Sequence, residues 1–235
     1  MNGESLRIRL RRRLSWALGI GLSDRGERVD VDLSRPLVEE RLDIYERNHL
    51  SRYRFAASLL GTQDIVGDFA CGTGYGTIIL AGKVRHAYGC DRNGRVVTAV
   101  RRRYASVTNA TFLNADLLEL SGLPPLDAIV SFETVEHLPE QHIPLLFSVF
   151  RHLLQPGGHL IFSCPYRQED QPAARLHHRT FDIDESRIGA WLDGAGFSPE
   201  EFLFQDYRTH AIRGAGPPAD FVLCRARASD GEAKR

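Results

Sequence analysis

Short apolar runs alternate with helical stretches along the chain from Asp64 onward. Each run is bounded by turn or helix signals, and each has the length of a buried strand. The runs are residues 65–69, 87–90, 111–113, 128–132 and 159–164. Strands that alternate with helices are joined by right-handed crossovers. The pattern therefore predicts an α/β fold with a doubly wound, mostly parallel sheet and helices on both faces.

The C-terminal part of the chain continues this pattern. Residues 143–154 form an apolar-rich helical stretch, which Pro156, Gly157 and Gly158 bring to an end. Strand candidates near residues 201–205 and 221–225 follow it, so we expect seven strands in the sheet. Residues 228–235 have the composition of a frayed tail.

The first 60 residues lack strand patterns and predict a helical cap in front of a main domain at residues 61–227. Within the cap, residues 7–14 alternate apolar and basic side chains. This pattern is typical either of a helix that binds a membrane surface or an acidic polymer, or of a helix whose charged face is simply solvated. We favour the solvated face, because runs of charge usually have that role. Pairing with a second copy in a homodimer stays open.

The chain has 30 basic and 30 acidic side chains, so its formal net charge is zero. A nucleic-acid partner usually requires a basic excess, so we do not expect one. No apolar run reaches the about 20 residues of a membrane-spanning helix, and no secretory signal pattern begins the sequence, so we expect no membrane span and a cytoplasmic location. Cys71, Cys90, Cys164 and Cys224 are widely separated, which indicates reduced, buried thiols.

The first crossover contains a glycine-rich turn between a strand and a helix, with the sequence DFACGTGYGT at residues 68–77. Glycines such as Gly72 and Gly74 allow a ligand to approach the backbone closely, and the free N–H groups at a helix start suit an anionic group. The dinucleotide fingerprint requires a glycine or alanine where this chain has Thr77, and the ending of a phosphate-binding loop is missing. Both observations argue against NAD and nucleoside triphosphates.

Two acidic residues follow the next two strands. Asp91 closes the second strand, where a carboxylate can accept hydrogen bonds from ribose hydroxyls. Asp116 follows the third strand, where it can meet the edge of an adenine. A glycine turn and two acids at neighbouring strand ends indicate one nucleoside site at the carboxyl edge of the sheet.

From Arg52 to Phe197 the chain resembles the class I S-adenosylmethionine-dependent methyltransferases, which have a Rossmann-like fold. The resemblance rests on the glycine turn, on Asp91 and Asp116 in order and spacing, and on the turn QPGGHL at residues 155–160. It implies that the glycine turn holds the methionine part of the cofactor and that the acids hold ribose and adenine. The residues it assigns to the cofactor are Arg52, Asp68, Ala70, Gly72, Gly74, Asp91, Asp116, Leu117 and Glu133.

The end of the fourth strand has the pattern E-x-x-E-H at Glu133, Glu136 and His137. If a helix begins there, these positions share one face, and their side chains suit Mg²⁺ or Mn²⁺ better than a thiophilic metal. The pattern is similar to that of small-RNA 2′-O-methyltransferases and quinone-pathway O-methyltransferases, in which such side chains bind a divalent metal. Those families add a later histidine, for which His177 fits and His178 is an alternative.

A metal-free interpretation competes with this one. In it, Glu133 contacts the cofactor, Glu136 is an acid at a helix start, and His137 is a general base. His177 and His178 would then be surface residues. We favour the metal set Glu133, Glu136, His137 and His177, with His137 and His178 as candidate catalytic residues.

A methyltransferase with this site must mainly orient its acceptor and make it nucleophilic. A divalent ion does both for a hydroxyl, so we expect O-methylation of a small molecule, namely a sugar or an oligosaccharide. Tyr166, Arg175 and the polar loop 167–171 favour a carbohydrate over an apolar quinone or catechol precursor, and the zero net charge disfavours a small-RNA end. A non-catalytic nucleotide-binding module and an NAD-linked oxidoreductase are the alternatives from other classes.

Overall fold

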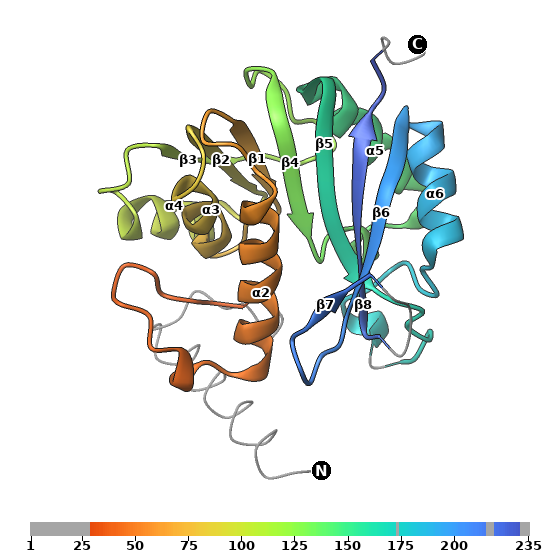
Figure 1. Cartoon of the computed structure of the whole chain (residues 1–235), viewed down its shortest axis with the longest axis horizontal. Helices are drawn as coiled ribbons and strands as arrows, with labels where there is room; N and C mark the ends of the chain where they lie inside the picture. The colour runs from red at the N-terminus through yellow and green to blue at the C-terminus, as the bar shows by residue number, and fades with distance from the viewer. Residues whose placement is uncertain (1–28, 173, 215–218, 231–235) are drawn as a thin grey trace.

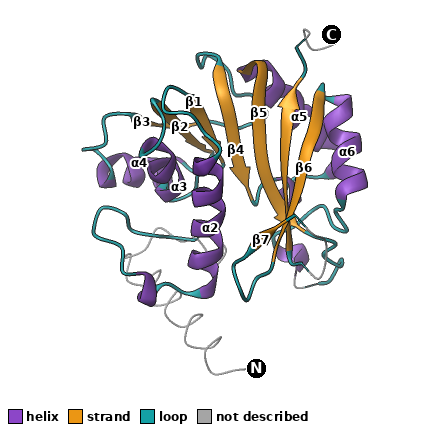
Figure 2. Cartoon of the chain, in the orientation of Figure 1, coloured by secondary structure: helices purple, strands orange, loops and turns teal. Residues whose placement is uncertain are grey.

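The computed structural model describes residues 29–172, 174–214 and 219–230, and these form one mixed sheet with helices on both faces (Figures 1 and 2). The strand order is β3-β2-β1-β4-β5-β8-β6-β7. The strands are β1 (Ile65–Phe69), β2 (His86–Asp91), β3 (Ala110–Asn114), β4 (Leu126–Phe132), β5 (Leu154–Pro165), β6 (Phe197–Gln205), β7 (Ile212–Arg213) and β8 (Phe221–Ala228). The predicted α/β fold is confirmed. Its eighth strand is the two-residue β7, which the sequence did not indicate.

Strands β1 to β5 are parallel, whereas β8 is antiparallel both to β5 and to β6. Parallel neighbours need a crossover, usually a helix, between them. The described residues between β6 and β8 contain the short strand β7 and no helix, so β8 returns beside β6 in the opposite direction. The strand β8 extends to Ala228, the first residue of the expected tail.

The helices divide between the two faces of the sheet. The α-helices are α2 (Ile44–Ser58), α3 (Tyr75–Ala81), α4 (Gly94–Arg103), α5 (Ile143–Leu153) and α6 (Glu185–Gly194). One core cluster packs residues of α5 and α6 against the sheet, and another packs residues of α2 and α3 against the opposite face. The single turns η1 (Glu39–Arg41), η2 (Val135–His137), η3 (Glu140–His142) and η4 (Ala174–Leu176) are 3-10 helices.

Helix α2 is the described part of the predicted N-terminal cap. It begins with a capping box, in which Asp43 accepts from the backbone of Glu46 and Glu46 accepts from the backbone of Asp43. This cap fixes where the helix starts and therefore which residues face the sheet edge. The basic segment 7–14 lies outside the described residues, so its role stays a prediction.

The four cysteines are free and buried, as the sequence indicates. Among the described helices, none combines the length and the apolar character that crossing a membrane requires.

Candidate functional site

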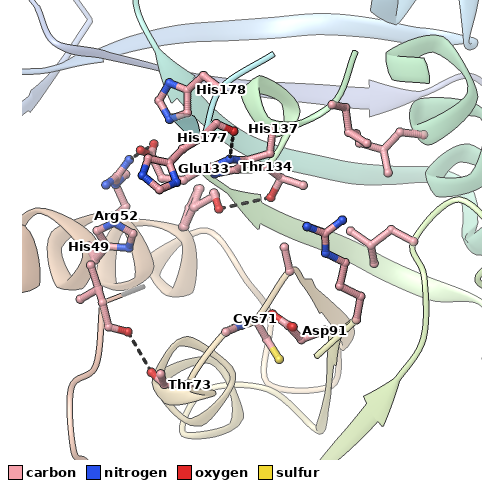
Figure 3. Close-up of a pocket in the computed structure, with 18 of the residues that line it drawn as sticks. His49, Arg52, Cys71, Thr73, Asp91, Glu133, Thr134, His137, His177 and His178 are labelled. Atoms are coloured by element: carbon pink, nitrogen blue, oxygen red, sulfur yellow. Dashed lines mark hydrogen bonds and ion pairs between the residues drawn. The ribbon is translucent and has the colours of Figure 1, made fainter. Parts of the chain in front are cut away.

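A cleft of about 1220 Å³ runs along the carboxyl edge of the parallel strands (Figure 3). Most of the residues that the sequence singled out line it. They are Arg52, Ala70, Gly72, Asp91, Asp116, Leu117, Glu133, His137, His177 and His178. Asp68, Gly74 and Glu136 are not among the lining residues.

The glycine turn joins β1 to α3 with three residues in the left-handed region: Ala70 (φ 62°), Gly72 (φ 54°) and Gly74 (φ 77°). Gly74 is the N-cap of α3. A Cβ on it would lie 2.5 Å from Cγ1 of Val100 in α4. Both the dihedral angle and this close approach require glycine at position 74. The glycine at position 74 is therefore required by the packing of α3 against α4. Ala70 and Gly72, in contrast, line the cleft.

Asp91 connects the second strand to the glycine turn. Its Oδ2 accepts from the backbone N of Gly72 at 3.0 Å, and its Oδ1 accepts from the backbone N of Asn93 at 2.8 Å. These two bonds fix the orientation of the Asp91 carboxylate at the end of β2. Asp116 follows β3 and accepts from the backbone N of Leu118 at 3.0 Å. Both acids line the cleft on the side of β2 and β3.

Asp68 is fully buried beneath the cleft. Its Oδ1 accepts from the hydroxyl of Tyr53 in α2 at 3.0 Å, and its Oδ2 accepts from the hydroxyl of Thr77 in α3 at 2.6 Å. Burial raises the pKa of Asp68 to about 6, although these two hydrogen bonds oppose the shift. Asp68 therefore ties α2 and α3 to β1 and supports the cleft from below.

Because the carboxyl of Asp68 is buried, we expect the free energy of unfolding to depend on pH. The pKa of Asp68 is about 6 in the folded chain, against 3.8 for an unperturbed aspartate, so between these values the folded state binds more protons than the unfolded state. The free energy of unfolding is therefore expected to fall as pH rises through this window, by about 3 kcal/mol from this group alone. Urea unfolding of the native chain and Asp68→Asn between pH 4 and 7 measures the difference. Parallel curves for the two proteins would show that the carboxyl does not titrate in this range.

Glu133 directly follows β4 and lies in the left-handed region, with φ 53°. Its backbone N donates to the backbone O of Ser163, and its Oε1 accepts from Nη1 of Arg52 at 2.5 Å. Only the single 3-10 turn Val135–His137 follows it. The helix that was expected to bring Glu133, Glu136 and His137 to one face does not form, because the backbone turns at Glu133. Glu133 faces Arg52 instead.

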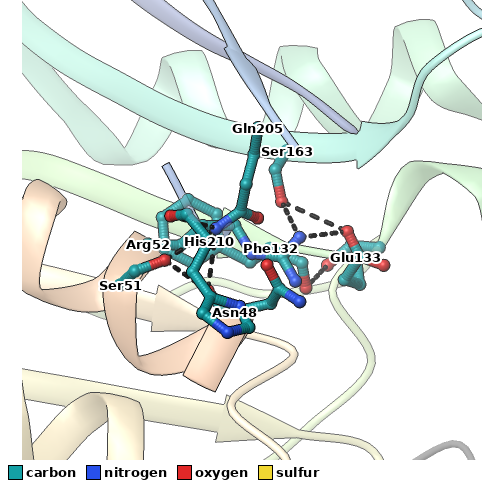
Figure 4. Close-up of polar contacts among 9 residues, drawn as sticks. Asn48, Ser51, Arg52, Phe132, Glu133, Ser163, Gln205 and His210 are labelled. Carbon is teal, nitrogen blue, oxygen red and sulfur yellow. Dashed lines mark hydrogen bonds and ion pairs between the residues drawn. The ribbon is translucent and has the colours of Figure 1, made fainter. Parts of the chain in front are cut away.

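Arg52 is fully buried and still has free donors (Figure 4). Its Nη1 donates to Glu133 and, at 3.1 Å, to the hydroxyl of Ser163, and its Cζ lies 4.5 Å from the ring centroid of Phe221. Within the described residues, its Nε and Nη2 have no hydrogen-bond partner. Because buried polar groups are nearly always paired, these donors fit a carboxylate of a bound ligand.

Glu136, His137 and His178 form a second group, in which three potential ligand atoms lie within 4.8 Å of one another. Nδ1 of His137 is 3.1 Å from the backbone O of His177, and Nδ1 of His178 is 2.6 Å from Oε1 of Gln168. Both partners are acceptors, so each Nδ1 donates, and in a neutral imidazole the lone pair is then on Nε2. Such an arrangement suits either a metal ligand or a general base.

The composition of this group differs from the predicted metal set. Glu133 pairs with Arg52, and His177 contributes its backbone oxygen to His137 while its imidazole is outside the group. The backbone N atoms of Arg179 and Thr180 both donate to the backbone O of Glu136. This pairing docks the segment after η4 onto η2, and it brings His178 to His137.

The environment of His178 favours a neutral imidazole. Burial, together with the neighbouring imidazoles of His137 and His177, lowers the pKa of His178 to about 4. The rings of His137 and His178 meet edge to face, with centroids 5.1 Å apart. A neutral imidazole is the form that binds metals and accepts protons.

The sequence analysis missed part of the cleft wall on α2. Tyr45, Asn48 and His49 line the cleft together with Arg52. These residues have the spacing i, i+3, i+4 and i+7, which places them on one face of a helix. Once Arg52 was singled out, this spacing was the signal that could have found them.

Residues 66–158 match a family described as a methyltransferase domain. Together with the glycine turn and the two acids in one cleft, this match decides the family. The chain contains a class I S-adenosylmethionine-dependent methyltransferase domain. The matched residues of this domain run from β1 into β5 and include the glycine turn, Asp91, Asp116 and Glu133.

Curated relatives of the methyltransferase domain include mycobacterial proteins. A probable S-adenosylmethionine-dependent methyltransferase of Mycolicibacterium smegmatis is 31% identical over 164 residues, which are 67% of this chain and 60% of the relative. One of Mycobacterium tuberculosis is 30% identical over 179 residues, which are 73% of this chain and 60% of the relative. The chain thus spans less than two thirds of their length.

Solved structures share the fold of this domain. The N-methyltransferase NodS from Bradyrhizobium japonicum, in complex with S-adenosyl-L-homocysteine, superposes with a TM-score of 0.63 at 18% identity. The match covers 91% of this chain and 97% of NodS. A putative methyltransferase of Haloferax volcanii, solved with the activator Trm112, gives a TM-score of 0.65 at 18% identity and covers 78% of this chain and 92% of that chain. These likenesses concern the fold alone.

Proposed function

We propose that this chain transfers the methyl group of S-adenosylmethionine to a hydroxyl group of a sugar or an oligosaccharide. The observation that supports the proposal is the continuity of the cleft. Its lining includes Asp91 and Asp116 at the nucleoside end and the imidazoles of His137 and His178 beyond β4. One cleft can therefore hold a nucleoside cofactor and an activated acceptor at the same time.

The order of the strands in the sheet supports S-adenosylmethionine as the ligand at the nucleoside end of the cleft. At this edge the neighbouring strands β3, β2, β1 and β4 place, in that order, Asp116, Asp91, the glycine turn and Glu133 at or just after their ends. Adenine, ribose and the methionine part would follow one another along this edge. The unpaired Nε and Nη2 of the buried Arg52 would then bind the methionine carboxylate.

The reaction needs one bond to form and one to break. The acceptor oxygen attacks the methyl carbon, the new C–O bond forms as the C–S bond breaks, and the bonding electron pair stays on sulfur to give S-adenosylhomocysteine. The hydroxyl proton must leave the acceptor, and Nε2 of His137 can accept it because its Nδ1 already carries a proton. Gln168 holds the second imidazole, that of His178, in the matching tautomer.

The same group fits a divalent cation. One carboxylate and two imidazoles within 4.8 Å, at Glu136, His137 and His178, form a donor set that suits Mn²⁺ or Zn²⁺ better than the oxygen-seeking Mg²⁺. When bound, such a cation lowers the pKa of a hydroxyl that it contacts. The metal-assisted reaction and the reaction with His137 as the base are therefore two forms of the proposal, and a metal-binding measurement separates them.

Titration with Mn²⁺ by isothermal calorimetry is expected to show one site per chain. His178→Ala is expected to weaken binding by about tenfold or more, because it removes one of three ligands. His177→Ala is the matched control and is expected to bind Mn²⁺ normally, since its imidazole is outside the group. Equal losses in both variants would contradict this ligand set, and no binding in the native chain would leave His137 as the base.

The proposed activity itself is tested in two steps. Calorimetry with S-adenosylhomocysteine is expected to show binding, and labelled S-adenosylmethionine is expected to transfer its methyl group to a saccharide. Binding without transfer to any saccharide, RNA end or catechol would favour a non-catalytic module. Transfer only to an RNA end or to catechol would favour the alternative acceptors.

A further inference from the structure

Three aromatic side chains form a continuous wall at one end of the cleft. The rings of Tyr45 and Tyr207 meet edge to face with centroids 5.2 Å apart, and the centroids of Tyr207 and Phe221 are 6.2 Å apart. Arg52 lies against the same Phe221. We call Tyr45, Tyr207 and Phe221 the aromatic wall, and all three line the cleft. Tyr45 is 41% exposed, so part of the wall is open to solvent.

The sheet order places the aromatic wall away from the nucleoside end. Phe221 begins β8, and Tyr207 follows the end of β6, on the side of β4 opposite to β1, β2 and β3. Asp91 and Asp116 belong to the ends of β2 and β3. A cofactor that extends from Asp116 to Glu133 therefore leaves the wall for a second ligand.

Polar groups fix the wall to α2. Nδ2 of Asn48 donates to the backbone O of Tyr207 at 2.9 Å and to the backbone O of Ile44 at 2.8 Å. Nε2 of Gln205 donates to the hydroxyl of Ser51 at 2.6 Å (Figure 4). The end of β6 and the loop after it are thereby joined to α2 by hydrogen bonds at neighbouring turns, and these hold Tyr207 beside Tyr45.

Asn48 also provides an acceptor that the protein leaves unused. The residue lines the cleft and is only 1% exposed, and its Oδ1 has no hydrogen-bond partner in the described part of the chain. Both N–H groups of its amide are already engaged, so the orientation of Oδ1 is fixed. A buried acceptor without a donor is costly, and a hydroxyl group of a ligand would satisfy it.

We propose that the aromatic wall and Asn48 form the acceptor subsite, in which a saccharide ring stacks on the exposed Tyr45 and one of its hydroxyl groups donates to Oδ1 of Asn48. This inference rests on the proposed function and adds to it the residues that select the acceptor. A pyranose has an apolar face for an aromatic ring and hydroxyl donors on its rim. A catechol has two hydroxyls, both needed at the reacting centre, and would leave Asn48 without a donor.

The polar loop that first suggested a carbohydrate is committed to other contacts. Gln168 binds His178, the hydroxyl of Tyr166 donates to Glu185, and Arg175 pairs with Asp170 on the surface. Tyr166, Gln168, Asp170 and Arg175 are all absent from the cleft lining. Selection of the acceptor is therefore assigned to α2, to the loop after β6 and to the start of β8.

The test measures methyl transfer from S-adenosylmethionine to methyl α-D-glucopyranoside, methyl α-D-mannopyranoside, maltotetraose and catechol. At least one saccharide is expected to exceed catechol as an acceptor. Tyr45→Ala is then expected to raise the KM for that saccharide about tenfold and leave kcat nearly unchanged, because stacking contributes to binding and not to the displacement. Tyr45→Trp is expected to restore the KM, since indole also stacks.

Controls separate this inference from the proposed function. Leu145→Ala truncates an exposed apolar residue outside the cleft and is expected to leave the KM unchanged. S-adenosylhomocysteine is expected to bind Tyr45→Ala as it binds the native chain. An unchanged KM in Tyr45→Ala, a preference for catechol, or no transfer to any of the saccharides overturns the acceptor subsite while cofactor binding persists. Loss of cofactor binding in the native chain overturns the proposed function itself.

Discussion

Asp91→Ala is expected to weaken S-adenosylhomocysteine binding by about 100-fold or more, because charge-assisted hydrogen bonds are worth about 1.5–3 kcal/mol each. The substitution removes the acceptors for the ribose hydroxyls. It also removes the bond from the backbone N of Gly72, which holds the glycine turn against β2. Isothermal titration calorimetry measures the change directly.

Two further variants show whether the charge or the fold is responsible. Asp91→Asn keeps an oxygen acceptor and is expected to retain part of the affinity. Asp193→Ala, at an exposed position in α6, is expected to bind as the native chain does. Native affinity in Asp91→Ala would refute the ribose role of this carboxylate.

His137→Ala is expected to lower kcat by about 100- to 1000-fold, the range typical of a lost general base, with S-adenosylhomocysteine affinity unchanged. The loss is expected whether His137 accepts the proton or binds a cation, since both roles use its Nε2. Steady-state kinetics with a saccharide acceptor, together with calorimetry, measure the two quantities.

The matched control is His152→Ala, at an exposed histidine of α5 that is outside the cleft lining. It is expected to keep full activity. If His137→Ala also keeps its kcat, proton removal and cation binding must both be assigned elsewhere. If it loses cofactor affinity instead, His137 belongs to the cofactor end of the cleft.

Much of the fold was predictable because its signals are local. The apolar runs at residues 65–69 and 128–132 coincide with β1 and the end of β4, and the helix expected at 143–154 is α5, which ends one residue earlier. Strand order is a long-range property. That β8 lies antiparallel between β5 and β6 depends on pairing between segments far apart in the sequence, for which the runs themselves give no direction.

The candidate site was likewise predictable only where its residues follow from the local pattern of strands and helices. Asp91 and Asp116 line the cleft because parallel strands end at one edge, which the alternation of strands and helices already required. The candidate group differs from the predicted metal set at Glu133, because helical spacing was assumed where the backbone enters the left-handed region. The choice of His178 over His177 depends on how the segment after η4 docks on Glu136, which spacing along the chain does not reveal.

By itself, the sequence determined an α/β methyltransferase domain with a candidate site at the strand ends, because hydrophobic periodicity and turn residues act over a few positions. The tertiary structure alone decided which side chains meet across the cleft: Glu133 with Arg52, His137 with His178, and Tyr45 with Tyr207. Each of these pairs joins residues from different elements, and their distances depend on how whole helices and strands pack.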